Sequence, residues 1–179
     1  MAIDQHYNVE LERKFLLNSI PNIEFTKVHY ITQSYLVRNE DQGEIRLRKV
    51  QNGGTTVYLQ AFKSIGNNRR REVEFPIDES IYVSLLEASG AKSRTITKVR
   101  FVGLLSSVSK TFQWREIEID EYLTGKHHGL LIGEVEFNSI EQMEAFDISR
   151  IDWIEEEVTG DPHYKNYNLA ITNTDESKH

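Results

Sequence analysis

The chain has 179 residues, of which 39% are hydrophobic and 27% charged, and this composition is typical of one globular domain with its own core. The formal net charge is −7, from 21 basic and 28 acidic residues, which argues against a broad nucleic-acid-binding surface. The absence of cysteine excludes disulfides and thiolate metal sites. No secretory signal or bilayer-spanning apolar stretch is visible, so we expect a cytoplasmic protein with no membrane partner.

The first predicted element is a strand near the N-terminus, which alternates strictly between charged and apolar residues. At a period of two, Glu10, Glu12 and Lys14 lie on one face. Val9, Leu11 and Phe15 lie on the other, with Arg13 among them. The strand therefore presents either a solvated surface or one wall of a charged site.

The next strands repeat this pattern with mainly basic residues. They are expected over residues 28–37, 44–50, 55–63 and 70–75, and a hairpin turn is expected at Asn52-Gly53-Gly54. The charged residues on their alternating faces are Arg46, Arg48, Lys63, Arg70, Glu72 and Glu74. Tyr35 is expected in the core, although its strand would also allow its hydroxyl to reach the charged face.

A helix is predicted from Asp78 to Ser89, with Asp78 as its cap, an apolar stripe at Ile81, Leu85 and Ala88, and Gly90 after its end. Further strands are expected over 98–101, 110–122 (the longest) and 130–137, and further helices over 139–148 and 163–171. The charged residues on these strands are Lys98, Arg100, Glu118, Asp120, Glu134 and Glu136. His127 and His128 fall in a glycine-flanked loop without ligand spacing, so we expect them to face solvent.

The element order predicts a mainly β fold with inserted helices. About eight mostly sequential strands joined by short turns favour an antiparallel meander that closes into a barrel. We expect a single domain over residues 5–171 and a flexible C-terminal tail over 172–179.

The charged faces allow two interpretations. Antiparallel strands commonly keep one face on the core and the other in water. However, the like charges at i and i+2 repel one another unless something of opposite charge lies against them. The amphipathic helices also need apolar sheet to pack on, which would be the outside of the barrel, so the ionic faces would then point inward.

Enclosed charges of this kind need ligands of their own. All-oxygen carboxylate ligation suits Mg²⁺ or Mn²⁺, and arginine forks suit phosphate oxygens. A metal-loaded triphosphate satisfies both groups. The residues therefore lead to the hypothesis of a triphosphate and divalent-metal site inside a β-barrel.

In order along the chain, these strands resemble the triphosphate tunnel metalloenzymes, also called the CYTH family. Their ExExK strand corresponds to Glu10, Glu12 and Lys14. The further matching segments are Arg46-Leu47-Arg48, Phe62-Lys63, residues 70–74, Lys98-Val99-Arg100, Glu118-Ile119-Asp120, Glu134-Val135-Glu136, Glu157-Val158-Thr159 and residues 164–170. Ala61 departs from the pattern, because bacterial relatives commonly have threonine there.

The resemblance implies a closed tunnel of about eight strands with helices outside, in which triphosphates are hydrolysed or cyclised with Mg²⁺ or Mn²⁺. It implies metal ligation by Glu10, Glu12, Glu118, Asp120, Glu134 and Glu136. It implies phosphate binding by Lys14, Arg46, Arg48, Lys63, Arg70, Lys98, Arg100 and Lys165. Glu12 and Lys98 are the candidate catalytic residues, Glu12 (or Glu10) for the attacking water and Lys98 for the water or the leaving group.

The first expectation for function is a metal-dependent tripolyphosphatase. The alternatives are a class IV-type adenylate cyclase, a thiamine triphosphatase, and a polyphosphate-binding module without turnover. A few short helices cannot cover the whole apolar exterior of a barrel, so we also expect a homodimer.

Overall fold

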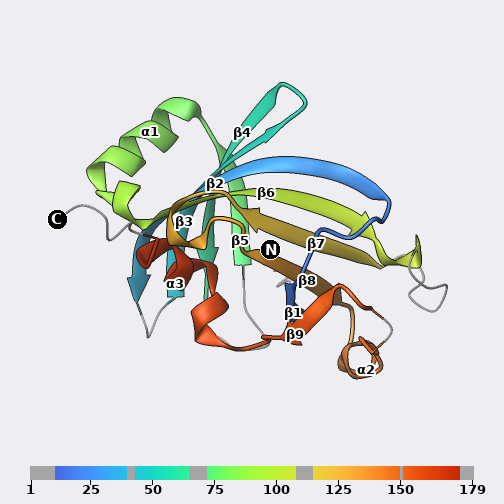
Figure 1. Cartoon of the computed structure of the whole chain (residues 1–179). Coiled ribbons are helices and arrows are strands. Elements are labelled where there is room, and N and C mark those ends of the chain that lie inside the picture. Colours follow the sequence, from blue (N-terminus) through green and yellow to red (C-terminus); the bar gives the residue numbers. More distant parts are fainter. Residues whose placement is uncertain (1–10, 40–42, 65–71, 108–114, 150, 174–179) are drawn as a thin grey trace, which may run out of the picture.

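The computed structural model describes residues 11–39, 43–64, 72–107, 115–149 and 151–173 (Figure 1). Nine strands form one antiparallel sheet in the order β5-β4-β3-β2-β6-β7-β8-β1-β9. The strands are β1 Leu11–Leu17, β2 Phe25–Asn39, β3 Gly43–Asn52, β4 Thr55–Lys63, β5 Glu72–Ile77, β6 Thr95–Leu104, β7 Glu116–Tyr122, β8 Leu131–Phe137 and β9 Ile154–Glu157. The helices are α1 Glu79–Ala88, α2 Ile140–Glu144 and α3 Asn166–Ile171, with short 3-10 turns that include η1 Ala91–Arg94 and η5 Pro162–Tyr164.

The predicted fold class, a mainly antiparallel β structure with inserted helices, is confirmed. In detail, the sheet has nine strands because β9 adds to β1, and among the described residues β5 and β9 are the two edges with no ladder between them. The expected hairpin turn is also confirmed, since Gly53 and Gly54 have φ angles of 52° and 91°.

Strand β2 links the two halves of the sheet. It has 15 residues and pairs with β3 on one side and β6 on the other, which makes it longer than β7, whose described length is seven residues. The expectation that residues 110–122 form the longest strand is therefore not met in the described part of the chain, and residues 108–114 lie outside it. Every hydrogen-bonded path between the two halves of the described sheet passes through β2.

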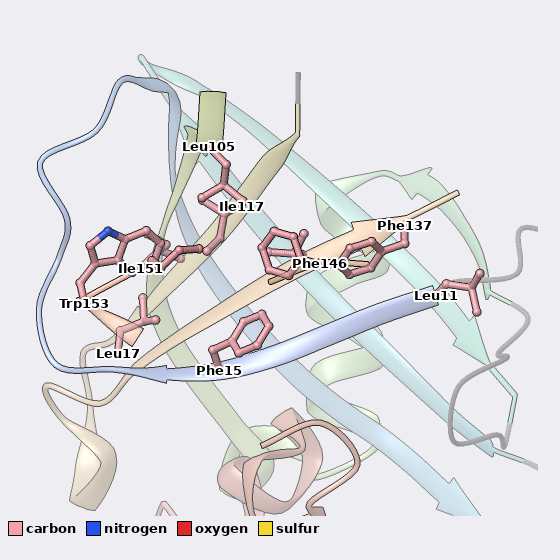
Figure 2. Packing of buried hydrophobic residues seen from close by; sticks show 11 residues of the cluster. Leu11, Phe15, Leu17, Leu105, Ile117, Phe137, Phe146, Ile151 and Trp153 are labelled. Carbon is pink, nitrogen blue, oxygen red and sulfur yellow. The ribbon is translucent and has the colours of Figure 1, made fainter. Parts of the chain in front are cut away.

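The main hydrophobic core lies on the outer face of β1, β7 and β8. Odd-numbered residues of β1, such as Phe15, pack there with Val135, Phe137 and Phe146 (Figure 2). The Phe137 and Phe146 rings meet edge to face at 5.4 Å between centroids. Ser139 caps α2 by accepting a hydrogen bond from the backbone N–H of Gln142, as predicted, but α2 ends at Glu144 rather than at Ile148.

Helix α1 covers the outer face of the other half of the sheet. Its buried residue is Tyr82, whose ring lies 4.9 Å from that of Tyr58. The predicted stripe was wrong, because Ile81 is 46% exposed and Ala88 is also exposed, while the buried position belongs to Tyr82. Asp78 is the N-cap residue, as predicted, but its side chain makes no capping hydrogen bond.

Helix α3 differs from the other two because it packs on the inner face of the sheet. Leu169 and Ala170 join a buried cluster with Tyr35, Ile96, Tyr122 and Ile132. Tyr122 is opposite Lys98 in the ladder and Tyr35 is opposite Arg46, so these aromatic residues project to the same side as the charged ones. The expectation that all helices lie outside therefore fails for α3. No helix in the described ranges has both the length and the apolar character needed to cross a membrane.

Strand β9 is held against β1 by an ion pair on the outer face. The guanidinium of Arg13 donates to both carboxylate oxygens of Glu157, at 2.9 and 2.5 Å. The Lys14 backbone N–H donates to Thr159 Oγ1 at 3.0 Å. These contacts fix the segment of β1 that carries Glu12 and Lys14 on its inner side.

Candidate active site

The cross-strand register places most of the predicted site residues on one face of the sheet. Directly paired residues project to the same side, and Glu12 is opposite Glu136 while Lys14 is opposite Glu134. The same register continues through the pairs Glu118 with Glu134, Arg100 with Asp120, Gln33 with Arg48, Arg46 with Ala61 and Lys63 with Glu72. This side is the inner face, and the apolar core of Figure 2 lies on the opposite side.

One part of the inner face, which we call the mixed wall, is formed by β6, β7, β8 and β1. Asp120 lies at its centre and accepts hydrogen bonds from Lys98 Nζ at 2.5 Å and from Arg100 Nε and Nη2 at 2.7 Å each. The Glu134 carboxylate forms ion pairs with Lys14 Nζ at 2.5 Å and with Arg100 Nη2 at 3.3 Å. Arg100 also donates to Glu118.

The mixed wall is deeply buried, and its pKa values reflect this. The Lys98 and Asp120 side chains are 1% and 0% exposed. Burial lowers the pKa of Lys98 to about 8, with Arg100 adding to the effect and Asp120 opposing it. Burial disfavours the charged form of Asp120, yet Arg100 and Lys98 hold its pKa below the usual range. Lys14 and Arg100 likewise overcome burial to hold the pKa of Glu134 well below its ordinary value.

Beside these pairs lies a group of carboxylates with a shortage of cations. Burial raises the pKa of Glu136, and the neighbouring Glu118, Glu12 and Glu134 raise it further. Within the described ranges, no ion pair engages Glu12 or Glu136. As they stand, no three described carboxylates or imidazoles converge closely enough to hold a metal ion. The donor chemistry nevertheless fits Mg²⁺ or Mn²⁺, because the donors are all oxygen and a cation would relieve the repulsion that raises the pKa of Glu136.

The second part of the inner face, the basic wall, is formed by β3, β4 and β5. Arg46 donates to Glu72, Lys63 Nζ lies 3.2 Å from Glu72 Oε2, and Arg48 Nη1 lies 3.2 Å from Glu74 Oε2. Although burial opposes the charge, Glu72 raises the pKa of Arg46. Burial lowers the pKa of Arg48, and Arg46 lowers it further. The basic wall thus holds three cations beside two carboxylates.

The two walls face one another across the curved sheet. Arg100 on the mixed wall contributes to the lowered pKa of Arg48 on the basic wall. Lys63 in β4 similarly lowers the pKa of Glu136 in β8, against the larger raising effect of burial. Strands β4 and β8 are five positions apart in the sheet order, so they influence one another only because the sheet curls. We call the space between the walls the channel.

Two uncharged residues on β2 support the basic wall; Gln33 was not predicted as a site residue, and Tyr35 was expected either in the core or with its hydroxyl at the charged face. Gln33 is fully buried, and its Oε1 accepts a hydrogen bond from Arg48 Nε at 3.2 Å. Its Nε2 donates to the Tyr35 hydroxyl at 2.5 Å. The available signal was position, because Gln33 shares the parity of Tyr35 within a β-rich strand. Glu72 and Glu74 were placed on the charged face from the sequence but received no role.

The structure brings most of the predicted residues together but does not describe all of them. The predicted metal ligand Glu10 and the predicted phosphate ligand Arg70 lie outside the described residues. Lys165 occupies the N-cap position of α3. The predicted residues that line the two walls are Glu12, Lys14, Arg46, Arg48, Lys63, Lys98, Arg100, Glu118, Asp120, Glu134 and Glu136.

The chain is similar in sequence to two inorganic triphosphatases. It is 36% identical to that of Nitrosomonas europaea over 163 residues, which are 91% of this chain and 97% of the relative. It is 31% identical to that of Acetivibrio thermocellus over 161 residues, or 90% and 92% of the two chains. The crystal structure of the inorganic triphosphatase NE1496 covers 93% of this chain and 97% of its own, with a TM-score of 0.64 and 34% identity. No family model matches the chain.

Proposed function

Because this chain belongs to the triphosphate tunnel metalloenzymes, the CYTH family that includes the inorganic triphosphatases, we propose that it hydrolyses inorganic triphosphate in the channel. The observation that carries the proposal is that Arg100 of the mixed wall lies close enough to Arg48 of the basic wall to lower its pKa, while Arg100 and Lys98 share Asp120. Phosphoryl transfer needs positioned cations around the phosphate oxygens more than it needs a covalent nucleophile.

The basic residues hold the phosphate chain. Arg46, Arg48 and Lys63 exchange their present carboxylate partners for phosphate oxygens, since a guanidinium fork pairs as well with phosphate as with carboxylate. Lys14 and Arg100 contribute from the opposite wall. Arg70 and Lys165 keep the phosphate-binding role expected from the sequence.

The substrate favoured by this site is compact. The buried cluster around α3 fills the inner face near Tyr35, Tyr122 and Ile132. A small inorganic chain fits a charged site bounded by such an apolar end better than a substrate with a bulky organic group does.

We also propose that the activity requires Mg²⁺ or Mn²⁺. Glu12, Glu118, Glu134 and Glu136 would hold the metal, together with Glu10 from the sequence expectation. The metal ligation expected for Asp120 stays a prediction, and both its oxygens accept hydrogen bonds from Lys98 and Arg100. When bound, the metal supplies neutralisation of phosphate charge and a lower pKa for the attacking water.

The reaction transfers the terminal phosphoryl group to water. The water oxygen forms a bond to the terminal phosphorus, the bridging P–O bond breaks, and its electron pair leaves with diphosphate. Glu12 orients the water and accepts its proton, and Lys98 stabilises the developing charge on the leaving oxygen. Orthophosphate and diphosphate are the products.

One panel of assays tests this proposal. The protein is incubated with tripolyphosphate, ATP or thiamine triphosphate, with Mg²⁺, Mn²⁺ or EDTA, and phosphate and cyclic AMP are measured. We expect phosphate from tripolyphosphate at the highest rate, loss of activity in EDTA, and a loss of about 100-fold or more in Glu12→Gln. Cyclic AMP as the main product from ATP, or tight binding without any product, contradicts the proposal.

We propose, finally, that the protein forms a homodimer through the outer face of the basic half. Val37, Phe62, Val73 and Phe75 are 53%, 42%, 59% and 39% exposed, and the Phe62 and Phe75 rings stack at 6.2 Å. An apolar group of this kind on an open sheet face is typical of a subunit interface. Light scattering at micromolar concentration should give twice the mass of the chain, and Phe62→Ser should weaken the association. A monomeric mass for the unmodified protein contradicts the dimer.

A further inference from the structure

A second candidate site lies outside the channel, in a pocket beside α3. Its volume is about 420 Å³, within the range of small-molecule sites. It is formed by the connection between β7 and β8 and by the segment that carries η5 and α3. The lining residues are Lys126, His127, His128, Leu130, His163, Tyr164, Asn168, Leu169 and Thr172.

The pocket is basic in a protein that is acidic overall. Of the nine described residues that line it, one is lysine, three are histidine and none is acidic, whereas the chain carries a net charge of −7. Burial lowers the pKa of His127, and the neighbouring Lys126 lowers it further. Lys126 therefore gives the pocket a positive charge, and no carboxylate among the described lining residues offsets it.

Hydrogen bonds engage one ring nitrogen of each of two histidines that line the pocket. His127 Nε2 lies 3.0 Å from Thr172 Oγ1, and Asp161 Oδ1 lies 2.8 Å from His163 Nδ1, which leaves the Nε2 side of His163 for a ligand. Arg38 donates to Asn168 Oδ1 at 2.8 Å and so adds a positive charge beside a residue that lines the pocket. An anion in the pocket thus meets Lys126 and the imidazoles of His128 and His163, of which His163 is paired with Asp161.

We propose that this pocket binds a phosphate group, as an inorganic phosphate or as an organic phosphate monoester. Ammonium groups and the N–H groups of imidazole rings donate hydrogen bonds to phosphate oxygens. The apolar part of the lining, Leu130, Tyr164 and Leu169, can contact an organic group attached to the phosphate.

The pocket also shares residues with the core of the domain. Leu169 is buried in the cluster around α3, and Leu130 and Tyr164 pack against that cluster. A ligand in the pocket therefore contacts the side chains that seat α3 against Tyr122 and Ile132. The pocket does not depend on the proposed triphosphatase activity, because no residue of either wall lines it.

Histidine ring NMR of the full chain tests the proposal, because His127, His128 and His163 report on the pocket while His29, which is opposite Arg100 on the inner face, reports on the channel. Orthophosphate, diphosphate and AMP are each titrated in EDTA at pH 6 and pH 8. We expect saturable shifts of the pocket histidines at both pH values, because Lys126 and the imidazole N–H groups donate to the phosphate oxygens. Tighter binding of AMP assigns an organic monoester, and equal or tighter binding of the inorganic anions assigns inorganic phosphate.

A paired substitution separates the pocket from general charge effects. In the double variant Lys126→Gln/His128→Gln, the affinity obtained from the His163 shifts should fall by about tenfold. Any shifts of His29 should stay as they are in the unmodified protein. Lys92→Gln, at an exposed lysine on η1, is the matched control and should change neither. Absence of saturable shifts at the pocket histidines with all three anions overturns the proposal, whatever His29 shows. Shifts that persist unchanged in the double variant overturn it as well.

Discussion

The two walls of the channel use the same types of side chain in different ways. On the mixed wall, Asp120 is 0% exposed and Lys98 1%, and each carboxylate oxygen of Asp120 accepts from a cation. On the basic wall, Glu74 is 28% exposed and lies on β5, an edge of the described sheet. Asp120 of the mixed wall lies on β7, which has a paired strand on each side. The carboxylates of the basic wall lie on β5, which is paired on one side only in the described sheet.

This difference suits the mixed wall to stabilising the fold and the basic wall to exchanging its carboxylate partners for a ligand. A buried ion pair that loses one partner leaves an uncompensated charge in a low-dielectric interior. A partly exposed carboxylate on an edge strand can move away when a phosphate arrives, and water screens what remains. The Asp120 network therefore holds the mixed wall in shape, whereas under the proposed function the more exposed Glu74 occupies the place of a phosphate oxygen beside Arg48.

The largest expected effect is on folding, from Asp120→Asn. The substitution leaves Lys98 and Arg100 buried without their shared anion, so the free energy of unfolding should fall by about 3–5 kcal/mol. Urea unfolding followed by circular dichroism measures it, with Asp152→Asn at an exposed position as the control. A loss below about 1 kcal/mol would show that the mixed wall is not the fixed part.

The pH dependence of stability offers a second way to test the mixed wall. The pKa of Lys98 falls from 10.5 to about 8 on folding, so between those values the unfolded chain binds the extra proton. Stability should therefore rise as the pH increases from about 8 to 10.5, by up to about 3 kcal/mol, and Lys98 should contribute no pH dependence well below pH 8 or well above pH 10.5. Urea unfolding in EDTA should show this rise for the unmodified protein relative to Lys98→Met. Parallel pH profiles for the two proteins would contradict it.

On the basic wall the main effect should be on catalysis. Arg48→Ala removes a donor to the phosphate chain and should lower kcat/KM for tripolyphosphate by about 100-fold, with little change in the urea midpoint. Lys49→Ala is the matched control, because Lys49 pairs with Tyr58 on the outer face of the same strand. Equal losses in the two variants would remove the distinction between the faces.

A smaller effect is expected from Gln33→Leu. The side chain fits the site but no longer accepts from Arg48 Nε, so the guanidinium loses its orientation and KM should rise about tenfold. Thr32→Val on the opposite face of β2 serves as the control. An unchanged KM would mean that Gln33 acts only through packing.

The smallest effect should have the opposite sign. Glu74→Gln frees Arg48 from its carboxylate partner, so KM for tripolyphosphate should fall by about threefold. The same change of carboxylate to amide therefore destabilises one wall and tightens binding on the other. A rise in KM in this variant would show that Glu74 is a ligand of the substrate complex rather than a placeholder.

The alternation of charged and apolar residues was sufficient to predict which side chains share a face of each strand. Strand β4 begins and ends at Thr55 and Lys63 as predicted, and the charged side chains of the described strands share one face because the side-chain period of a strand is two. The pairing of strands that are far apart in the sequence, such as β2 with β6, could not be predicted from the local sequence of either strand. The extra strand β9 depends on Arg13 and Glu157, which are 144 residues apart.

The helices were predicted less well because their burial depends on tertiary partners. Tyr82 is the buried residue of α1 since the ring of Tyr58 lies below it, and no periodicity in the helix reveals that ring. Helix α3 has too few residues to show which face of the sheet its apolar side chains would cover. Gln33 carries no charge, so the pattern of ionisable residues did not indicate it, although its Oε1 accepts a hydrogen bond from Arg48.

Strand β2 is the hydrogen-bonded connection between the two walls of the described sheet, because β3 pairs with one of its edges and β6 with the other. Its ladder with β3 shifts register between Tyr35 and Val37. The spacing between Arg48 and Arg100 is therefore set across a single strand, and a change in the curvature of β2 would alter that spacing without breaking a ladder inside either wall.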